Sequence, residues 1–239
     1  MCTLEKKPNN IFILTLTGDG EHRLNPTLLH SIQSALRRVR QEATASSALI
    51  TTAHGKFFSN GYDIAWAQSK EEQLEQRMMI MDDLHRSIVS DLLSFPFPTI
   101  AAITGHASAA GYVFALAHDY VLMRSDRGFL YMSELDISRV IPGWFVALVE
   151  AKVASPASRR RIVMQAAKLT AKEALRLGVV DSAHDSAVET VEAAVDLAGE
   201  LVKRGWDGHV YGENRKRFLA NVIRAVEDTS ERNNTRSRL

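Results

Sequence analysis

The first 53 residues read as a strand, a helix and a second strand, and this order constrains the fold more than any other feature. Residues 11–17 (IFILTLT) alternate apolar and β-branched side chains and run into a glycine-rich turn, which predicts a strand. Asn25 and Pro26 are typical of a helix start, and apolar residues at helical spacing follow them. Residues 48–53 (ALITTA) predict the second strand. Such a unit joins parallel neighbours, so we expect an α/β fold with an at least partly parallel sheet.

The rest of the chain predicts one large domain with a helical end. Further strands are predicted at residues 99–104 and 119–123, and a long charged helix with a solvated polar face at residues 71–94. From Gly143 onward the pattern is almost wholly helical, so the sheet is expected to end by about residue 131. We expect three segments: a core domain over residues 1–190, a helical region over 191–227 and a flexible tail over 228–239.

Composition excludes several classes of function. The 29 basic and 28 acidic residues leave a net charge of +1, so no global field favours nucleic acid or an acidic membrane surface. No apolar run approaches the ~20 residues that span a bilayer, so no membrane span is expected. The single cysteine, Cys2, excludes an intramolecular disulfide framework and a cysteine-based zinc site, and no metal site is predicted. Any site that binds an anion must therefore be formed by a few neighbouring residues and not by the overall charge of the protein.

The last three residues carry a targeting signal. Ser237-Arg238-Leu239 is a basic variant of the Ser-Lys-Leu peroxisomal address, and the start of the chain lacks the apolar core of a secretory signal. The tail therefore predicts a peroxisomal location and a peroxisomal import receptor as partner.

Two loops each follow a predicted strand, the first with a Ser-Asn-Gly turn and the second dominated by small residues. Residues 55–64 (GKFFSNGYDI) come after the strand at 48–53, and residues 104–112 (TGHASAAGY) come after the strand at 99–104. In α/β sheets the carboxyl ends of strands carry the functional loops, and small residues let backbone N–H groups approach a ligand closely. Taken alone, an ordinary turn and close helix packing account for both loops. Neither loop matches a phosphate-binding or dinucleotide-binding glycine pattern.

Taken together, FFSNGYDIAWA and GHASAAGYVFALAHDY resemble the two oxyanion-hole loops of the crotonase (enoyl-CoA hydratase/isomerase) superfamily. The resemblance extends to GFLYMSELDISRVIPGWF and LTAKEALRLGVVD, covers nearly the whole chain, and is greatest to plant peroxisomal Δ3,Δ2-enoyl-CoA isomerases. It implies a spiral core of ββα turns, a C-terminal helical trimerisation region and a homotrimer or hexamer. It also implies an acyl-CoA thioester as substrate and no cofactor, since coenzyme A is part of that substrate.

The resemblance assigns roles to individual residues. The two oxyanion-hole N–H groups fall on Tyr62 and Ala110, and the catalytic acid/base falls on Glu134. Hydratases of the superfamily use a second glutamate, and its position is Val113 here. A valine cannot activate water, so the pattern favours a Δ3,Δ2-enoyl-CoA isomerase in which Glu134 alone moves a proton from C2 to C4. Residues expected to contact the substrate are Ser59, Asn60, Gly61, Asp63, Ala109 and Gly111.

Two alternatives stay open on the sequence. Asp136 or Asp63 could supply a second acid for enoyl-CoA hydration or dienoyl-CoA isomerisation, although each is more typical of a cap or a turn. The absence of a glutamate at Val113 is also compatible with a non-catalytic acyl-CoA-binding subunit.

The surroundings of the two loops carry further expectations. His106 is interpreted as a structural histidine bonded to backbone. Lys56 and the basic trio at residues 215–217 are candidates for the CoA phosphates, although solvated helix charge is the simpler reading of the trio. Apolar neighbours of Glu134 are expected to dehydrate it: Leu130, Leu135, Ile137, Val140 and Ile141.

Overall fold

The computed structural model describes residues 1–44 and 46–228, so the tail signal at residues 237–239 lies outside the described residues. The main sheet runs in the order β1-β2-β3-β5-β7-β9, in which β1 is antiparallel to β2 and all other neighbours are parallel. Its strands are β1 (Cys2–Lys7), β2 (Ile11–Leu16), β3 (Ala48–Ala53), β5 (Thr99–Ile103), β7 (Tyr120–Arg124) and β9 (Ser182–His184). A smaller parallel sheet contains, in this order, β4 (Phe57–Ser59), β6 (His106–Ser108) and β8 (Leu130–Tyr131).

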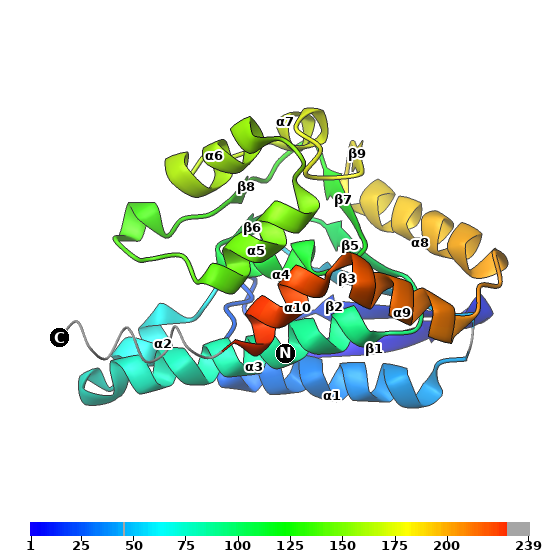
Figure 1. The fold of residues 1–239 in the computed structure, drawn as a ribbon, viewed down its shortest axis with the longest axis horizontal. Helices are drawn as coiled ribbons and strands as arrows, with labels where there is room; N and C mark the ends of the chain where they lie inside the picture. Colours follow the sequence, from blue (N-terminus) through cyan, green and yellow to red (C-terminus); the bar gives the residue numbers. More distant parts are fainter. Residues whose placement is uncertain (45, 229–239) are drawn as a thin grey trace.

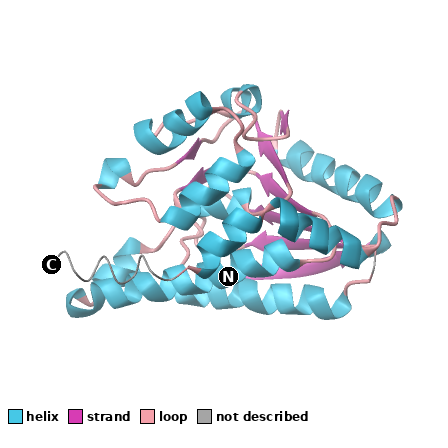
Figure 2. Ribbon diagram, viewed as in Figure 1, coloured by secondary structure: helices cyan, strands magenta, loops and turns pink. Residues whose placement is uncertain are grey.

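Helices surround the main sheet (Figures 1 and 2). The α-helices are α1 (Pro26–Glu42), α2 (Ile64–Gln68), α3 (Leu74–Ser94), α4 (Ala110–Leu116), α5 (Gly143–Lys152), α6 (Pro156–Gln165), α7 (Ala171–Arg176), α8 (Ala187–Lys203), α9 (Gly208–Phe218) and α10 (Ala220–Glu227). Short 3-10 helices lie at η1 (Pro8–Asn10), η2 (Glu71–Gln73) and η3 (Leu135–Ile137). Helix α1 begins as predicted, because the Asn25 side chain accepts a hydrogen bond from the Leu28 N–H at 3.0 Å.

Both faces of the main sheet are buried. In β2, Phe12 and Leu14 belong to the large core that α1, α3 and α4 complete, whereas Ile11 and Ile13 face the other way and pack with α8. Figure 1 shows α1 and α3 running side by side on one side of the sheet and α8 on the other. Two-sided burial explains why the parallel strands read as nearly continuous apolar runs. No helix within the described ranges is long and apolar enough to cross a membrane.

The mixed α/β fold with a largely parallel sheet is confirmed, but two fold predictions are wrong. The sheet does not end by residue 131, because β9 pairs with β7 through Ser182–His184. This three-residue strand has no alternating pattern of its own, and its pairing is set by tertiary contacts with the sheet edge. The polar face of α3 is not simply solvated, since His85 and Arg86 are buried. The predicted boundaries at residues 190 and 227 stay predictions.

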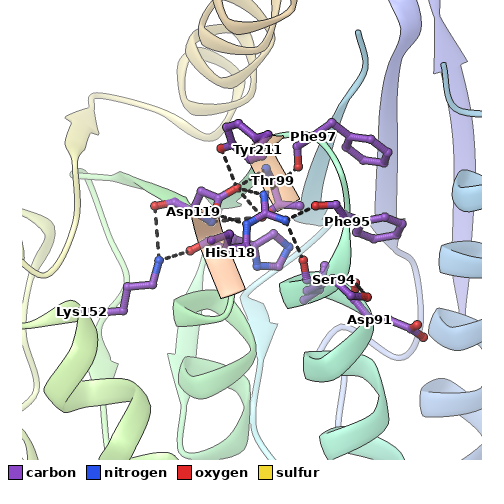
Figure 3. Close-up of polar contacts among 11 residues, drawn as sticks. Asp91, Ser94, Phe95, Phe97, Thr99, His118, Asp119, Lys152 and Tyr211 are labelled. Carbon is purple, nitrogen blue, oxygen red and sulfur yellow. Dashed lines mark hydrogen bonds and ion pairs between the residues drawn. The ribbon is translucent and has the colours of Figure 1, made fainter. Parts of the chain in front are cut away.

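The C-terminal helices are fastened to the core by a buried ion pair. Arg215 of α9 is only 6% exposed and binds the Asp119 carboxylate, with Nε 2.8 Å from Oδ1. Its guanidinium also donates to the carbonyls of Phe95 at 2.6 Å and Phe97 at 2.7 Å, and Tyr211 donates to Asp119 at 3.2 Å. Figure 3 shows Tyr211, Asp119, Phe95 and Phe97 gathered around this ion pair. The interpretation of Arg215 as solvated charge or as a phosphate ligand is therefore wrong.

Replacing Arg215 should destabilise the protein strongly. Arg215→Met leaves the partly buried Asp119 charge unpaired, and we expect the free energy of unfolding to fall by about 3 kcal/mol. Urea unfolding followed by circular dichroism measures this. Lys216→Met is the matched control, because Lys216 is an exposed neighbour whose ion pair among the described residues is with Glu213 on the same helix. Equal effects of the two variants would contradict the assigned role of Arg215.

Candidate active site

The small parallel sheet brings the three predicted site segments to one edge. Strands β4, β6 and β8 are neighbours and run in the same direction, so their carboxyl ends lie together. Directly after them come residues 60–62, residues 109–110 and residues 132–134 respectively. The Ala109 N–H donates to the Tyr131 carbonyl at 2.9 Å, which joins the second loop to the strand leading to Glu134.

The two predicted donor amides have no acceptor among the described residues. Leu24 bridges the first loop, donating to the Gly61 carbonyl at 2.8 Å and accepting from the Asp63 N–H at 3.4 Å. In this parallel bridge the N–H of Tyr62 points away from Leu24. Ala110 is the first residue of α4, so its N–H has no intrahelical partner. Two such free donors can stabilise a developing oxyanion.

The two loops touch where these amides lie. A Cβ added to Gly61 would be 3.4 Å from the Ala110 nitrogen, and one added to Gly111 would be 2.7 Å from the Cβ of Ser59. Gly61 has φ +73°, and Ala109 has φ 48° and ψ −123°, a backbone conformation that favours glycine. Strain of this kind costs about 1–3 kcal/mol and persists only where the surroundings enforce it.

Glu134 is a buried carboxylate without a counter-charge beside it. It is 6% exposed, and its Oε2 has no hydrogen-bond partner among the described residues. Burial raises the pKa of the Glu134 carboxyl above its ordinary value. Its backbone carbonyl accepts from the N–H of Arg139 at 2.8 Å, which closes a tight turn around η3. Burial, then Asp82 and, to a smaller extent, the charge of Glu134 raise the pKa of the Tyr62 phenol.

The other predicted contact residues have partners inside the protein. Ser59 is fully buried and donates to the His22 carbonyl at 2.8 Å. Asp63 caps α2 through the Trp66 N–H at 2.9 Å, and its second oxygen accepts from Asn25 at 3.1 Å. The Asn60 side-chain amide lies 3.4 Å from the carboxylate of Glu21. These side chains therefore hold the loop in place, and the loop presents mainly backbone.

Within residues 1–44 and 46–228, neither candidate position supplies a second acid beside Glu134. Asp136 is exposed, and Val113 is fully buried in α4. The structure does not bring His106 there either, since this residue begins β6 and lies at the opposite end of that strand from Ala109. The His106 ring packs between Phe57 and Phe129, with ring centroids 5.0 Å and 5.5 Å away.

The expected apolar surroundings of Glu134 are only partly present. Leu130 is fully buried, but Leu135, Ile137 and Val140 are 49%, 51% and 94% exposed, so the expectation is wrong for these three residues. The reason is local, because the 3-10 turn at η3, followed by Ser138 in the left-handed conformation, directs Glu134 inward and its neighbours outward.

One group of site residues was missed at the sequence level. The Tyr62 side chain binds Asp82 and His85 of α3, and Arg86 of the same helix also binds Asp82. The available signal was the spacing of Asp82 and Arg86, which are four residues apart on the helix face that also carries His85. Charge on a long helix normally predicts a solvated face instead.

The fold and site define a class of protein that can polarise a carbonyl with two backbone amides beside a buried carboxylate. The chain belongs to the enoyl-CoA hydratase/isomerase family, whose model matches residues 6–222. It is 57% identical to the peroxisomal enoyl-CoA delta isomerase 1 of Arabidopsis thaliana over 93% of this chain and 91% of that protein. It is 49% identical to enoyl-CoA delta isomerase 3 of the same plant, over 96% and 97%.

The fold is also shared with solved structures. A probable enoyl-CoA hydratase from Mycobacterium tuberculosis superposes with a TM-score of 0.85 at 21% identity, covering 94% of this chain and 91% of that one. At this identity the likeness concerns the fold.

The contact between the loops predicts a strict size limit at Gly111. Gly111→Ala forces a methyl group against Ser59, and we expect a loss of roughly 1–3 kcal/mol in unfolding free energy, as for overpacking. Gly199→Ala is the matched control, because no atom lies within 4 Å of its added Cβ and helix α8 should gain about 0.5–1 kcal/mol. Chemical denaturation of both variants checks this, and a Gly111→Ala protein as stable as wild type would rule out the close contact.

Burial of Glu134 predicts a pH-dependent cost in stability. Because its pKa is raised in the folded state, ionisation disfavours folding as pH rises through the ordinary value of 4.5 and above. Glu134→Gln, which carries no charge, should therefore melt at a higher temperature than wild type at pH 7. Near pH 4 the difference should vanish. Calorimetry at both pH values tests the prediction, and an equal difference at both would contradict it.

Proposed function

We propose that the protein is a Δ3,Δ2-enoyl-CoA isomerase that converts 3-enoyl-CoA into 2-trans-enoyl-CoA in the β-oxidation of unsaturated fatty acids. The observation that carries the proposal is the single buried carboxylate of Glu134 at the sheet edge that also holds the free N–H groups of Tyr62 and Ala110. The Arabidopsis relatives, which bear the name enoyl-CoA delta isomerase, support it.

The proposed reaction needs one base and one oxyanion site. The thioester oxygen accepts hydrogen bonds from the Tyr62 and Ala110 amides, and Glu134 removes a proton from C2. The C–H electrons form a dienolate whose negative charge the two amides stabilise. Glu134 then returns the proton to C4, the C2–C3 double bond forms, and the carbonyl is restored. The carboxylate is regenerated, so no net proton is consumed.

The environment of Glu134 suits this task. A desolvated carboxylate with a raised pKa is a stronger base than one in water. Its unpartnered Oε2 leaves an oxygen available to a substrate proton. With few competing water contacts, the proton it takes can be returned before it exchanges.

Hydration of an enoyl-CoA has less support. It needs a second group to hold the water, yet Val113 is apolar, Asp136 is exposed and both Asp63 oxygens are occupied. Water addition to crotonyl-CoA should therefore be slow compared with isomerisation of 3-hexenoyl-CoA.

The substrate also requires a site for the CoA phosphates. Lys56 lies near the start of the first loop and, with Arg127 and Lys168, makes up a basic cluster. Burial and then the charges of these three residues lower the pKa of His106. We propose this basic cluster as the phosphate site. Import by a peroxisomal receptor through Ser237-Arg238-Leu239, a peroxisomal location and a homotrimer or hexamer complete the proposal. The names of two Arabidopsis relatives, enoyl-CoA delta isomerases 1 and 2, include the word peroxisomal.

Loss of the base should abolish isomerisation. We expect Glu134→Gln to lower kcat for 3-hexenoyl-CoA by about 10²–10⁴-fold, the usual contribution of a positioned acid/base. The absorbance of the conjugated product measures the rate. Asp136→Asn removes an exposed carboxylate two residues away and should leave the rate within about twofold, since surface changes have small effects. A Glu134→Gln enzyme at near wild-type rate would show that another group is the base.

A further inference from the structure

A polar cluster holds the hydroxyl of Tyr62, which is the end of the side chain farthest from the loop backbone. Its hydroxyl donates to Asp82 Oδ1 at 3.1 Å and lies 3.2 Å from His85 Nδ1. Asp82 Oδ1 also accepts from the Trp144 indole N–H at 3.0 Å, and Oδ2 accepts from Arg86 Nε at 2.6 Å. Asp82 is therefore the shared acceptor of three side chains from three elements.

His85 adds rigidity without adding charge. Burial lowers the pKa of His85 to about 3, so the ring is neutral near pH 7. Since the Tyr62 hydroxyl donates to Asp82, it can accept from His85 Nδ1–H. The ring packs edge-on against Trp144 and Phe145, at 5.0 Å and 6.0 Å between centroids. The phenol of Tyr62 is thus fixed by hydrogen bonds and by packing.

Arg86 extends the cluster to the last described helix. Its Nη1 donates to the carbonyls of Ala225 and Val226 at 2.9 Å and to that of Asp228 at 3.1 Å. These bonds satisfy carbonyls at the C-terminal end of α10, which packs on α3 and α5. The anchor of Tyr62 is therefore connected to the core and to the C-terminal region.

The first loop needs such an anchor. Gly61 has φ +73°, and glycine allows a wide range of backbone conformations, so the Tyr62 peptide could rotate away from the site. The Leu24 bridge holds the backbone on one side, and the phenol contact holds the residue at the tip of its side chain. Two points of attachment fix the direction of the amide between them.

We propose that Asp82 is a positioning residue for the first oxyanion donor, acting through the Tyr62 hydroxyl to direct the Tyr62 N–H at the thioester oxygen. The proposal rests on the proposed function, in which this amide polarises the substrate carbonyl. Asp82 itself touches no reacting atom.

The chain contains its own control for this arrangement. Tyr211, Asp119 and Arg215 form a second cluster in which a tyrosine hydroxyl and an arginine bind one aspartate, with the hydroxyl at 3.2 Å. Tyr211 binds Asp119, the residue before β7, as Figure 3 shows, and Arg215 also binds the carbonyl of Phe95 just after α3. No loop of the candidate site belongs to this second cluster. Tyr62→Phe and Tyr211→Phe therefore make the same chemical change in two places.

The experiment combines turnover with a spectroscopic readout. Each variant is titrated with cinnamoyl-CoA, whose absorption moves to longer wavelength when its thioester carbonyl is polarised, and kcat and KM are measured with 3-hexenoyl-CoA. We expect Tyr62→Phe to lower kcat at least about tenfold with KM nearly unchanged, because a slightly misplaced catalytic group is costly. The red shift of bound cinnamoyl-CoA should shrink. Tyr211→Phe should change neither quantity.

Two further variants sharpen the result. Asp82→Ala should reproduce the loss of kcat and red shift. Adding Tyr62→Phe to it should lower kcat no further, since Asp82→Ala already removes the Tyr62–Asp82 hydrogen bond together with the bonds from Trp144 and Arg86. If Asp82→Ala does not fold, the kcat and red shift of Tyr62→Phe alone test the proposal. A Tyr62→Phe protein with wild-type kcat and red shift overturns the proposal. A wild-type protein that gives the red shift without isomerising 3-hexenoyl-CoA overturns the proposed function. The positioning role of Asp82 is then tested by the red shift alone, which should still be smaller in the variants than in wild type.

Discussion

The parallel pairing of three very short strands is the constraint on which the rest of the site depends. Strands β4, β6 and β8 contain only two or three residues each, yet their order places the two amide-bearing loops and Glu134 at one edge. The contact between Gly111 and Ser59 holds the first two loops together, and it allows no side chain at that glycine. Short strands suffice here because the main sheet and its helices hold both of their ends.

The site is built from features that lower stability. Within the part of the chain that the structure describes, two amides lack acceptors and the Glu134 carboxylate lacks a partner at Oε2, and Ala109 has a strained backbone. Under the proposed function, a bound thioester would offset two of these costs, because the amides would gain an acceptor and the carboxylate would gain a proton. The surrounding structure offsets the cost with a two-sided sheet core and with buried ion pairs such as those of Asp82 and Asp119.

Much of the fold could be predicted from the sequence, because β2, α1 and β3 have strong local patterns and a proline-marked helix start. Strand β9 and the buried role of Arg215 could not, since each depends on contacts with residues about 60 to 120 positions away. The three site segments were predicted from motifs, whereas their meeting at one edge required the pairing of β4, β6 and β8. The cluster behind Tyr62 was missed because charge on a helix is usually solvated, and only packing against α5 and α10 buries this one.

The central claim is that one carboxylate, shielded from water, both removes and returns the proton. The most direct measurement uses 3-hexenoyl-CoA that carries deuterium at C2 and allows a single turnover in ordinary water. Mass spectrometry and NMR of the 2-trans product then show where the deuterium is. The account predicts that a substantial share of the deuterium taken from C2 appears at C4. A product whose C4 contains only solvent hydrogen, under conditions where the starting material keeps its label, would contradict a single shielded base.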